Sequence, residues 1–433
     1  MKDFNSFDWV DKAAPEKART VQEALFLEHM GYLAQHSGYY KNMFAREGID
    51  PGRVGLADLP HIPFTEKGDI EKYNDDFLAV PKRKVADIVL SSGTTGKPTR
   101  IMYTESDMTR LAYNEKIALS RTGITDEDTV LLTCTMDRCF VAGQAYYSGL
   151  RQIGAAAIRN GLSGIASHLE ILYSMPVSAI VGVPSFLQKL GESIAERGET
   201  GIFKSVKRLI CIGEPVRDKE LTLRALGAAL ENTWGAEVYS TYASSEIVTT
   251  FCECSERKGG HAHPALGYTE VIDSSGKTLP AGEVGEVVFT PFMVEGMPLL
   301  RFKTGDVSFF IDQPCGCGRS SIRLGPILGR KKQMIKMRGT TFYPQSIFAQ
   351  LDEIEHVSEY YMVVSSEHEL SDNVEVFVSV SDSTISPEDI ATRLQAKLRV
   401  KPSVVIQGDE DIRSVVYSAK HRKPIRFFDH RRQ

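Results

Sequence analysis

Residues 91–97, Ser-Ser-Gly-Thr-Thr-Gly-Lys, form the segment of this chain best suited to binding phosphate. Small residues let a backbone approach an anion closely, hydroxyls and amide N–H groups donate to phosphate oxygens, and lysine adds a positive charge. The segment is not a Walker A loop, because too few residues separate its glycines and Pro98 follows the lysine. An ordinary polar turn is the alternative, but strands predicted over 85–90 and 101–103 favour a phosphate loop.

Three further segments carry side chains suited to nucleotide and cation chemistry, in the order Tyr242–Glu246, Arg301–Asp306 and Gly329–Lys336. Glu246 offers the oxygen ligand that a hard cation such as Mg²⁺ prefers. Asp306 offers a carboxylate that can accept hydrogen bonds from both hydroxyls of a ribose. Taken singly, Glu246 could be a solvated loop carboxylate and Asp306 an ordinary turn residue. The ordered set is more specific than any one segment.

Together the four segments resemble the adenylate-forming superfamily of acyl- and aryl-CoA ligases, luciferases and peptide-synthetase adenylation domains. The short length and the segments Ile62–Lys67 and Cys315–Arg319 make the chain similar to the phenylacetate–CoA ligase branch. The resemblance covers nearly the whole chain. It implies an ATP-dependent ligase that forms an acyl-adenylate and then a CoA thioester, on phenylacetate or a related aryl acid, with ATP, Mg²⁺ and coenzyme A.

The resemblance also implies roles for individual residues. Residues 91–97 would hold the β- and γ-phosphates, Glu246 would bind Mg²⁺ as a catalytic residue, and Asp306 would bind the ribose with help from Arg330. Arg301 is open between a motif role and a plain surface charge. The residues implied to contact ATP or AMP are Ser91, Ser92, Gly93, Thr94, Thr95, Gly96, Lys97, Glu214, Tyr242, Ala243, Ser244, Ser245, Asp306 and Arg330.

A lysine near the C-terminus completes the expected catalytic set. The family's Gly-Lys-x-x-Arg pattern is matched by Lys423-Pro424-Ile425-Arg426, although Arg422 stands where glycine is usual. Such a lysine would bridge the attacking carboxylate and the α-phosphate. Lys420 is a competitor, and a solvated basic tail is the alternative interpretation of this segment.

Paired cysteines and histidines indicate a closed metal site. Two Cys-x-Cys pairs and one His-x-His pair occur after residue 250, and thiolate and imidazole ligands suit tetrahedral, structural Zn²⁺. Unligated reduced cysteines are the alternative. By resemblance to metal-containing relatives the ligands are Cys254, His261, Cys315 and Cys317. Cys252 and His263 are spare candidates.

The pocket for the acid is expected between the strand that ends at Cys134 and the loops that follow two later strands. The mix of aromatic and small residues there favours a flat, apolar acid such as an arylacetate or a benzoate, although an aromatic residue is more often part of a core. The predicted lining residues are Phe140, Ala142, Tyr147, Gly213 and Ala243.

Strands and helices alternate from residue 85 onward, which predicts an α/β fold with doubly wound, mainly parallel sheets. A small antiparallel β unit should follow residue 269. A boundary after Gly329 divides the chain into an N-terminal adenylate-forming domain, 1–329, and a small α+β C-terminal domain, 330–433. The family has a mobile lid in this place, with a hinge expected at Lys331 and Lys332.

Length, net charge and cysteine spacing limit the number of domains, the partners and the cellular compartment that we expect. A length of 433 residues predicts two domains, and the net charge of −5 argues against nucleic acid or a membrane surface as a partner. The chain begins without a signal-peptide pattern, and the cysteine spacings suit metal better than disulfides, so a reducing cytoplasm is the simplest compartment. A homodimer is left open.

Two rivals to the CoA ligase remain at the level of sequence. One is an adenylating enzyme with another acceptor, such as a carrier-protein thiol or a deazaflavin-like cofactor, because no CoA motif is present. The other is a catalytically silent binding protein on this fold, since Ala243 and Ser245 replace the family's Gly and Thr. Retention of Glu246, Asp306 and Lys423 argues against a silent protein.

Overall fold

The computed structural model describes residues 3–91, 99–337, 340–368, 371–398, 400–417 and 424–431. The chain divides into two compact units, which are described separately. Unit 1 comprises Met1–Thr304 and Ser308–Ile327, and unit 2 comprises Gly305–Val307 and Leu328–Gln433. In the described residues, no helix is long and apolar enough to cross a membrane.

A nine-stranded sheet is the centre of unit 1, and five of its strands are parallel. The strand order is β13-β14-β9-β8-β7-β6-β5-β3-β4, and β7, β6, β5, β3 and β4 run parallel to one another. The strands are β3 (Thr129–Leu132), β4 (Ala156–Arg159), β5 (Ala179–Gly182), β6 (Arg208–Cys211), β7 (Glu237–Ser244), β8 (Thr249–Cys252), β9 (Gly260–His261), β13 (Phe310–Ile311) and β14 (Arg323–Leu324).

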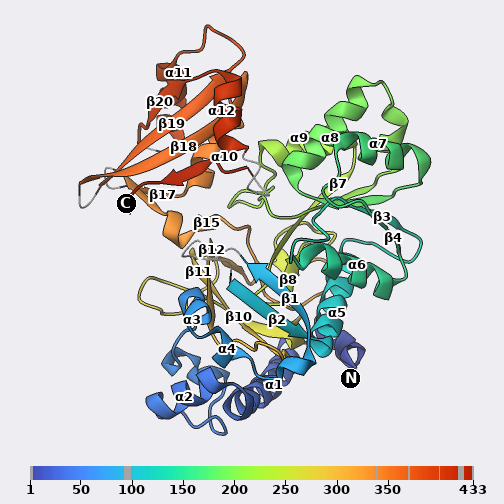
Figure 1. Ribbon diagram of the computed structural model, residues 1–433, viewed down its shortest axis with the longest axis vertical. Helices are drawn as coiled ribbons and strands as arrows, with labels where there is room; N and C mark the ends of the chain where they lie inside the picture. Colours follow the sequence, from blue (N-terminus) through green and yellow to red (C-terminus); the bar gives the residue numbers. More distant parts are fainter. Residues whose placement is uncertain are drawn as a thin grey trace. The chain divides into compact units, whose positions relative to one another are not determined.

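Helices cover both faces of this sheet, as a doubly wound fold requires (Figure 1). Successive residues of a strand point to opposite faces, so Leu131 and Val130 of β3 enter different clusters. The cluster with Leu131 contains residues of α7, α8 and α9, and the cluster with Val130 contains residues of α5 and α6. These helices are α5 (Glu105–Arg121), α6 (Ala142–Ile153), α7 (Ile165–Ser174), α8 (Pro184–Glu196) and α9 (Ala225–Trp234). The predicted α/β class is confirmed.

The rest of unit 1 consists of short elements and antiparallel pairs. Strands β1 (Val85–Ser91) and β2 (Thr99–Thr104) pair antiparallel on either side of the predicted phosphate loop, and β10 (Gly267–Ile272) pairs with β11 (Gly285–Pro291). The remaining elements are η1 (Phe4–Lys12), α1 (Pro15–His36), α2 (Gly38–Glu47), η2 (Leu56–His61), α3 (Lys67–Lys72), α4 (Asn74–Phe77), η3 (Lys82–Lys84), η4 (Thr200–Lys204), η5 (Pro264–Leu266) and the start of β12 (Phe302–Ser308).

Unit 2 is a small α+β unit built on a four-stranded sheet of order β20-β19-β18-β21. Helices α10 and α11 contribute to the larger apolar cluster against this sheet, whereas α12 packs with Tyr361 in a smaller one. Its elements are β15 (Gly329–Arg330), η6 (Lys331–Gln333), β16 (Ile335–Met337), β17 (Thr340–Phe342), α10 (Pro344–Leu351), β18 (Val357–His368), β19 (Ser371–Val380), α11 (Pro387–Leu398), β20 (Ser403–Ile406), α12 (Asp409–Val416) and β21 (Phe427–Asp429).

Two helices differ from the sequence pattern for local reasons. Apolar positions through 15–48 predict one helical stretch, but the structure has two helices there, because Ser37 has an extended backbone and its side chain caps α2. The sequence also predicts a helix over 218–230, but this helix begins only at Ala225. Asp218 instead accepts hydrogen bonds from Thr222 in a tight turn, so its side chain competes with the helix backbone.

Candidate active site and metal centre

The two strands that flank the predicted phosphate loop pair with each other, and one of them is bonded to the turn that carries Glu246. Ser91 is the last residue of β1 and pairs with Thr99 of β2, while 92–97 lie outside the described residues. The hydroxyl of Tyr103 on β2 donates to the carbonyl of Ser245 at 2.7 Å. This bond connects the loop's outgoing strand to the end of β7, where Tyr242 to Ser244 lie.

Glu246 carries an internal counter-ion that the sequence analysis missed. The ammonium of Lys67 lies 2.8 Å from Oε1 of Glu246, and the two side chains are only 19% and 7% exposed. Burial opposes ionisation, but Lys67 lowers the pKa of Glu246 below its ordinary value. Glu246 is therefore held as a carboxylate. The segment Ile62–Lys67 was used only to recognise the branch, and nothing in its local pattern points to residue 246.

Arg301 is a buried structural anchor, so its interpretation as a surface charge is wrong. Its side chain is 1% exposed and pairs with both carboxylate oxygens of Glu270. Its guanidinium also donates to the carbonyl of Ile62 and stacks over Phe64, 4.0 Å from the ring centroid. The arginine thus holds the segment that leads to Lys67 against the start of β12.

Asp306 and Arg330, the predicted ribose residues, are paired within unit 2. They are register partners in β12 and β15, and Nε of Arg330 lies 3.2 Å from Oδ1 of Asp306. The Asp306 side chain is 11% exposed and that of Arg330 is 61% exposed. Gly305, which precedes Asp306, has a φ of +76°, a conformation that residues other than glycine rarely adopt.

The predicted acid-pocket residues lie around the carboxyl ends of the parallel strands. Ala142 and Tyr147 of α6 pack partly buried against the cluster that holds Cys134 and Ile212. Gly213 follows Ile212, with a φ of +77°, and Ala243 lies in β7. Ligands bind at this edge in open α/β sheets.

Two other predicted contacts have structural partners of their own. Glu214 accepts hydrogen bonds from the backbone and hydroxyl of Ser185, each at 2.9 Å. Phe140 lines a surface cavity of about 660 Å³ between β1, α5 and α6, and the other four pocket residues do not line it. These positions leave the pocket assignments as predictions.

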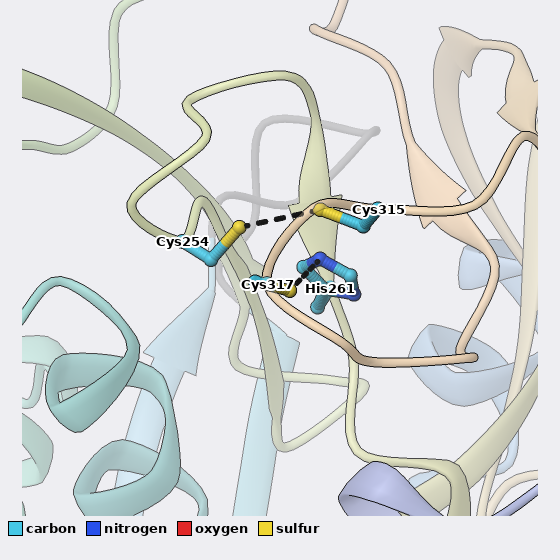
Figure 2. A group of neighbouring side chains, drawn as sticks. All are labelled: Cys254, His261, Cys315 and Cys317. Carbon is cyan, nitrogen blue, oxygen red and sulfur yellow. Dashed lines mark hydrogen bonds between the residues drawn. The ribbon is translucent and has the colours of Figure 1, made fainter.

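Four side chains from three separate segments meet in the predicted metal centre. The ligand atoms of Cys254, His261, Cys315 and Cys317 all lie within 4.8 Å of one another, and Figure 2 shows the four side chains converging. Sγ of Cys254 lies 3.6 Å from Sγ of Cys315, and Sγ of Cys317 lies 3.6 Å from Nε2 of His261. A tetrahedral zinc ion with bonds of about 2.3 Å would separate two sulfurs by about 3.8 Å, so the set fits.

The surroundings of these ligands suit a cation. Burial lowers the pKa of His261 to about 3, which keeps the imidazole neutral, and its Nδ1 lies 2.8 Å from the hydroxyl of Ser321. Burial raises the pKa of the Cys254 thiol to about 12, so a thiolate there requires a nearby positive charge. The spare candidates point elsewhere: Sγ of Cys252 donates to the Glu253 carbonyl, and His263 accepts from the backbone of Ala265.

The N-terminal segment reaches this metal centre through a buried ion network that the sequence analysis did not anticipate. Asp11 of η1 pairs with Arg121 of α5 and with Arg319, two residues after Cys317. Burial opposes its ionisation, but Arg121 and Arg319 hold the pKa of Asp11 well below its usual range. Arg121 also donates to the carbonyl of His261. The network therefore ties η1 to two of the metal-binding segments.

The predicted hinge lies just inside unit 2. Lys331 and Lys332 form the first residues of η6, a single 3₁₀ turn. Arg431 donates to the carbonyls of Lys332 and Met334, at 3.4 and 2.7 Å. Lys423 lies outside the described residues, but Arg426 of the same motif is described and pairs with Glu359.

Comparison with known proteins places the chain in a family. Residues 45–294 match the AMP-binding enzyme family, and residues 339–431 match the C-terminal domain of AMP-binding enzymes. The chain is 32% identical to a phenylacetate-coenzyme A ligase of Thermus thermophilus, over 85% of this chain and 82% of that protein. It is 25% identical to the phenylacetate-coenzyme A ligase of Escherichia coli, over 93% and 92%.

The chain belongs to the AMP-binding enzyme family, in the phenylacetate–CoA ligase branch of the adenylate-forming superfamily. It is an AMP-forming acid–thiol ligase that works through an acyl-adenylate. Among solved structures, a 2-hydroxyisobutyryl-CoA ligase in the postadenylation state has a TM-score of 0.86 at 21% identity, covering 98% of this chain and 92% of that one. This likeness concerns the fold.

Proposed function

We propose that the chain activates phenylacetate or a closely related aryl acid with ATP, releasing pyrophosphate, and then transfers the acyl group from AMP to the thiol of coenzyme A. The observation that carries the proposal is the 32% identity to a phenylacetate-coenzyme A ligase over more than four-fifths of both chains. The pocket composition agrees with it. By residue type, Phe140 and Tyr147 would offer flat apolar surface to such an acid, and Gly213 and Ala243 would leave room for it.

Charge neutralisation is the chemical demand on this site, because a carboxylate must attack a phosphate that is also negative. Residues 91–97 are proposed to hold the β- and γ-phosphates. Glu246, already ionised beside Lys67, is proposed to bind the Mg²⁺ that accompanies ATP. Asp306 and Arg330 are proposed to hold the ribose. When bound, Mg²⁺ would neutralise charge on the phosphates.

The four Cys and His side chains are proposed to bind one structural Zn²⁺, with no open position for substrate. The ligand set closes a site between segments that lie far apart in sequence. Its contribution would be to the folding of unit 1 and not to the chemistry.

The substrate is tested by pyrophosphate release across a panel of acids, with and without CoA. Phenylacetate and other aryl acids should be turned over fastest, and a thioester should form only when CoA is present. A preference for short aliphatic or hydroxy acids would refute the aryl assignment. Release of pyrophosphate without any thioester, together with acylation of a carrier-protein thiol, would refute CoA as the acceptor.

Lys423 is proposed as the residue that bridges the attacking carboxylate and the α-phosphate. Lys423→Ala should lower the rate of adenylation by at least about a hundredfold, as loss of transition-state charge stabilisation commonly does. Thioester formation from supplied acyl-adenylate should persist, and Lys420→Ala should leave both steps near the unaltered rate. If Lys420→Ala alone abolished adenylation, the two assignments would have to be exchanged.

A further inference from the structure

One buried carboxylate in unit 2 holds both flanks of the segment that contains Lys423. Glu359 lies on β18 and its side chain is 7% exposed. The hydroxyl of Tyr417 donates to its Oε1 at 2.7 Å, and the guanidinium of Arg426 donates to its Oε2 at 2.9 Å. Tyr417 precedes residues 418–423 directly, and Arg426 follows three residues after Lys423.

Two backbone hydrogen bonds hold the residues on either side of 418–423. The N–H of Ile425 donates to the carbonyl of Val416 at 3.0 Å, and the N–H of Met362 donates to the carbonyl of Arg426 at 2.8 Å. The guanidinium of Arg426 also stacks over the ring of Tyr360, 5.0 Å from its centroid. The described residues before and after 418–423 therefore meet at one place, and Glu359 is a side chain that both flanks bind.

The position of Glu359 is unusual for a carboxylate. By alternation along β18 it shares a face with Tyr361 and Val363, which pack in an apolar cluster with Ile412 and Val416 of α12. An apolar residue would pack beside this cluster without the cost of desolvating a charge. The pairing register of β18 with β19 shifts between Val357 and Glu359, and a local irregularity of this kind changes where nearby side chains point.

We propose that Glu359 is a positioning residue for adenylation: by holding Tyr417 and Arg426 together, it fixes the two described ends between which the segment bearing Lys423 is attached. The inference rests on the proposed role of Lys423. Glu359 is proposed to act through Tyr417 and Arg426, while Arg413 of α12 lies 3.9 Å from its Oε1 as a looser third partner. Small displacements of a catalytic group cost large factors in rate, so loss of this anchor should be visible in the first half-reaction.

The test compares Glu359→Gln with Asp352→Asn, both measured in each half-reaction. Asp352 is the matched control, because its Oδ1 accepts a hydrogen bond of 2.6 Å from the next tyrosine, Tyr360. Glu359→Gln should slow adenylation by about tenfold to a hundredfold, with KM for ATP and acid nearly unchanged. Thioester formation from supplied acyl-adenylate should stay within about twofold, and Asp352→Asn should leave both steps within about twofold.

A combination with Lys423→Ala separates the inference from the function on which it rests. If Glu359 acts through the lysine, adding Glu359→Gln to Lys423→Ala should cause no further loss of adenylation. A further loss in the double variant, or equal loss of both half-reactions in Glu359→Gln, would overturn the inference. If Lys423→Ala itself left adenylation intact, the role of the lysine would fail first.

Tyr417→Phe provides a milder variant should Glu359→Gln not fold. It removes one hydroxyl from the anchor and leaves the Glu359–Arg426 pair in place. Thermal unfolding should show a folded protein, with adenylation slowed by about threefold to tenfold and thioester formation retained. Unchanged adenylation in a folded Tyr417→Phe variant would also overturn the inference.

Discussion

At the scale of single residues, the pair of Lys67 and Glu246 shows how the fold keeps a buried carboxylate ionised. A buried carboxylate without a partner tends to take up a proton, because burial disfavours its charged form. Lys67 prevents this from a distance of 2.8 Å. A divalent cation bound by Glu246 would have to replace or share that contact.

Lys67→Met should therefore destabilise the protein in the absence of ligands and make it more responsive to Mg²⁺ and ATP. We expect a loss of roughly 2 kcal/mol in the free energy of unfolding, below the values typical of fully buried pairs because Lys67 is 19% exposed. Mg²⁺ with ATP should then raise the unfolding temperature more than in the unaltered protein, because the bound cation replaces the missing charge.

Lys303→Met is the matched control for that experiment. Lys303 pairs with Glu66 at 3.0 Å, but the carboxylate is 61% exposed and water can solvate it. Its loss should change stability by well under about 1 kcal/mol and leave the response to Mg²⁺ and ATP unaltered. An equal response in both variants would mean that Lys67 is not the counter-ion that matters to the site.

At the scale of elements, buried ion pairs hold the N-terminal 3₁₀ helix η1 close to the proposed metal centre. Asp11 links it to Arg121 on α5 and to Arg319 beside Cys317. Partners outside the ligand shell orient metal ligands, and their loss typically costs tenfold to a hundredfold in metal affinity. These ion pairs would therefore couple the stability of the N-terminal segment to that of the proposed zinc site.

Asp11→Asn should weaken zinc retention by about tenfold to a hundredfold, measured as transfer of zinc to a chromophoric chelator. The freshly purified protein should carry about one zinc per chain, and Cys315→Ser should lose the metal and stability together. Asp8→Asn is the control in the same helix, since Asp8 pairs with Lys116 near the surface and its side chain is 48% exposed. Equal retention of zinc in Asp11→Asn and Asp8→Asn would refute this role of Asp11.

At the scale of the whole molecule, the prediction concerns motion of the C-terminal unit. One geometry cannot both hold Lys423 at the α-phosphate and admit a thiol to the same carbonyl. The two steps therefore need different placements of the C-terminal unit, and we predict a hinge at Lys331 and Lys332.

Lys332→Pro should keep adenylation and lower thioester formation steeply. Lys332 lies in a 3₁₀ turn, whose φ values proline can adopt, so the conformation described here tolerates the ring. A second conformation that needs a different φ at residue 332 would be blocked, because proline fixes this angle. Single-turnover measurements of each half-reaction check this, with Lys332→Ala as the control that removes the charge alone. Unchanged thioester formation in Lys332→Pro would refute a hinge at this position.

The sequence by itself determined the class of the fold and the identity of most candidate residues. Alternating apolar runs predicted the doubly wound sheet, because strand burial leaves a local pattern. The phosphate loop, Glu246, Asp306 and the four metal candidates could be predicted from the sequence because the motifs that resemble the family are local too. The boundaries of helices such as α9 were less predictable, since a side-chain bond in a turn competes with the helix.

The tertiary structure decided which residues become partners. Lys67 reaches Glu246 across 179 positions, Asp11 reaches Arg319 across 308, and Arg426 reaches Glu359 across 67. The tertiary structure also brings the four candidate metal ligands together and leaves Cys252 and His263 out of that group. A single sequence carries no register between distant segments, and burial gives these ion pairs their strength. Only the packed fold brings the charges together and excludes water from them.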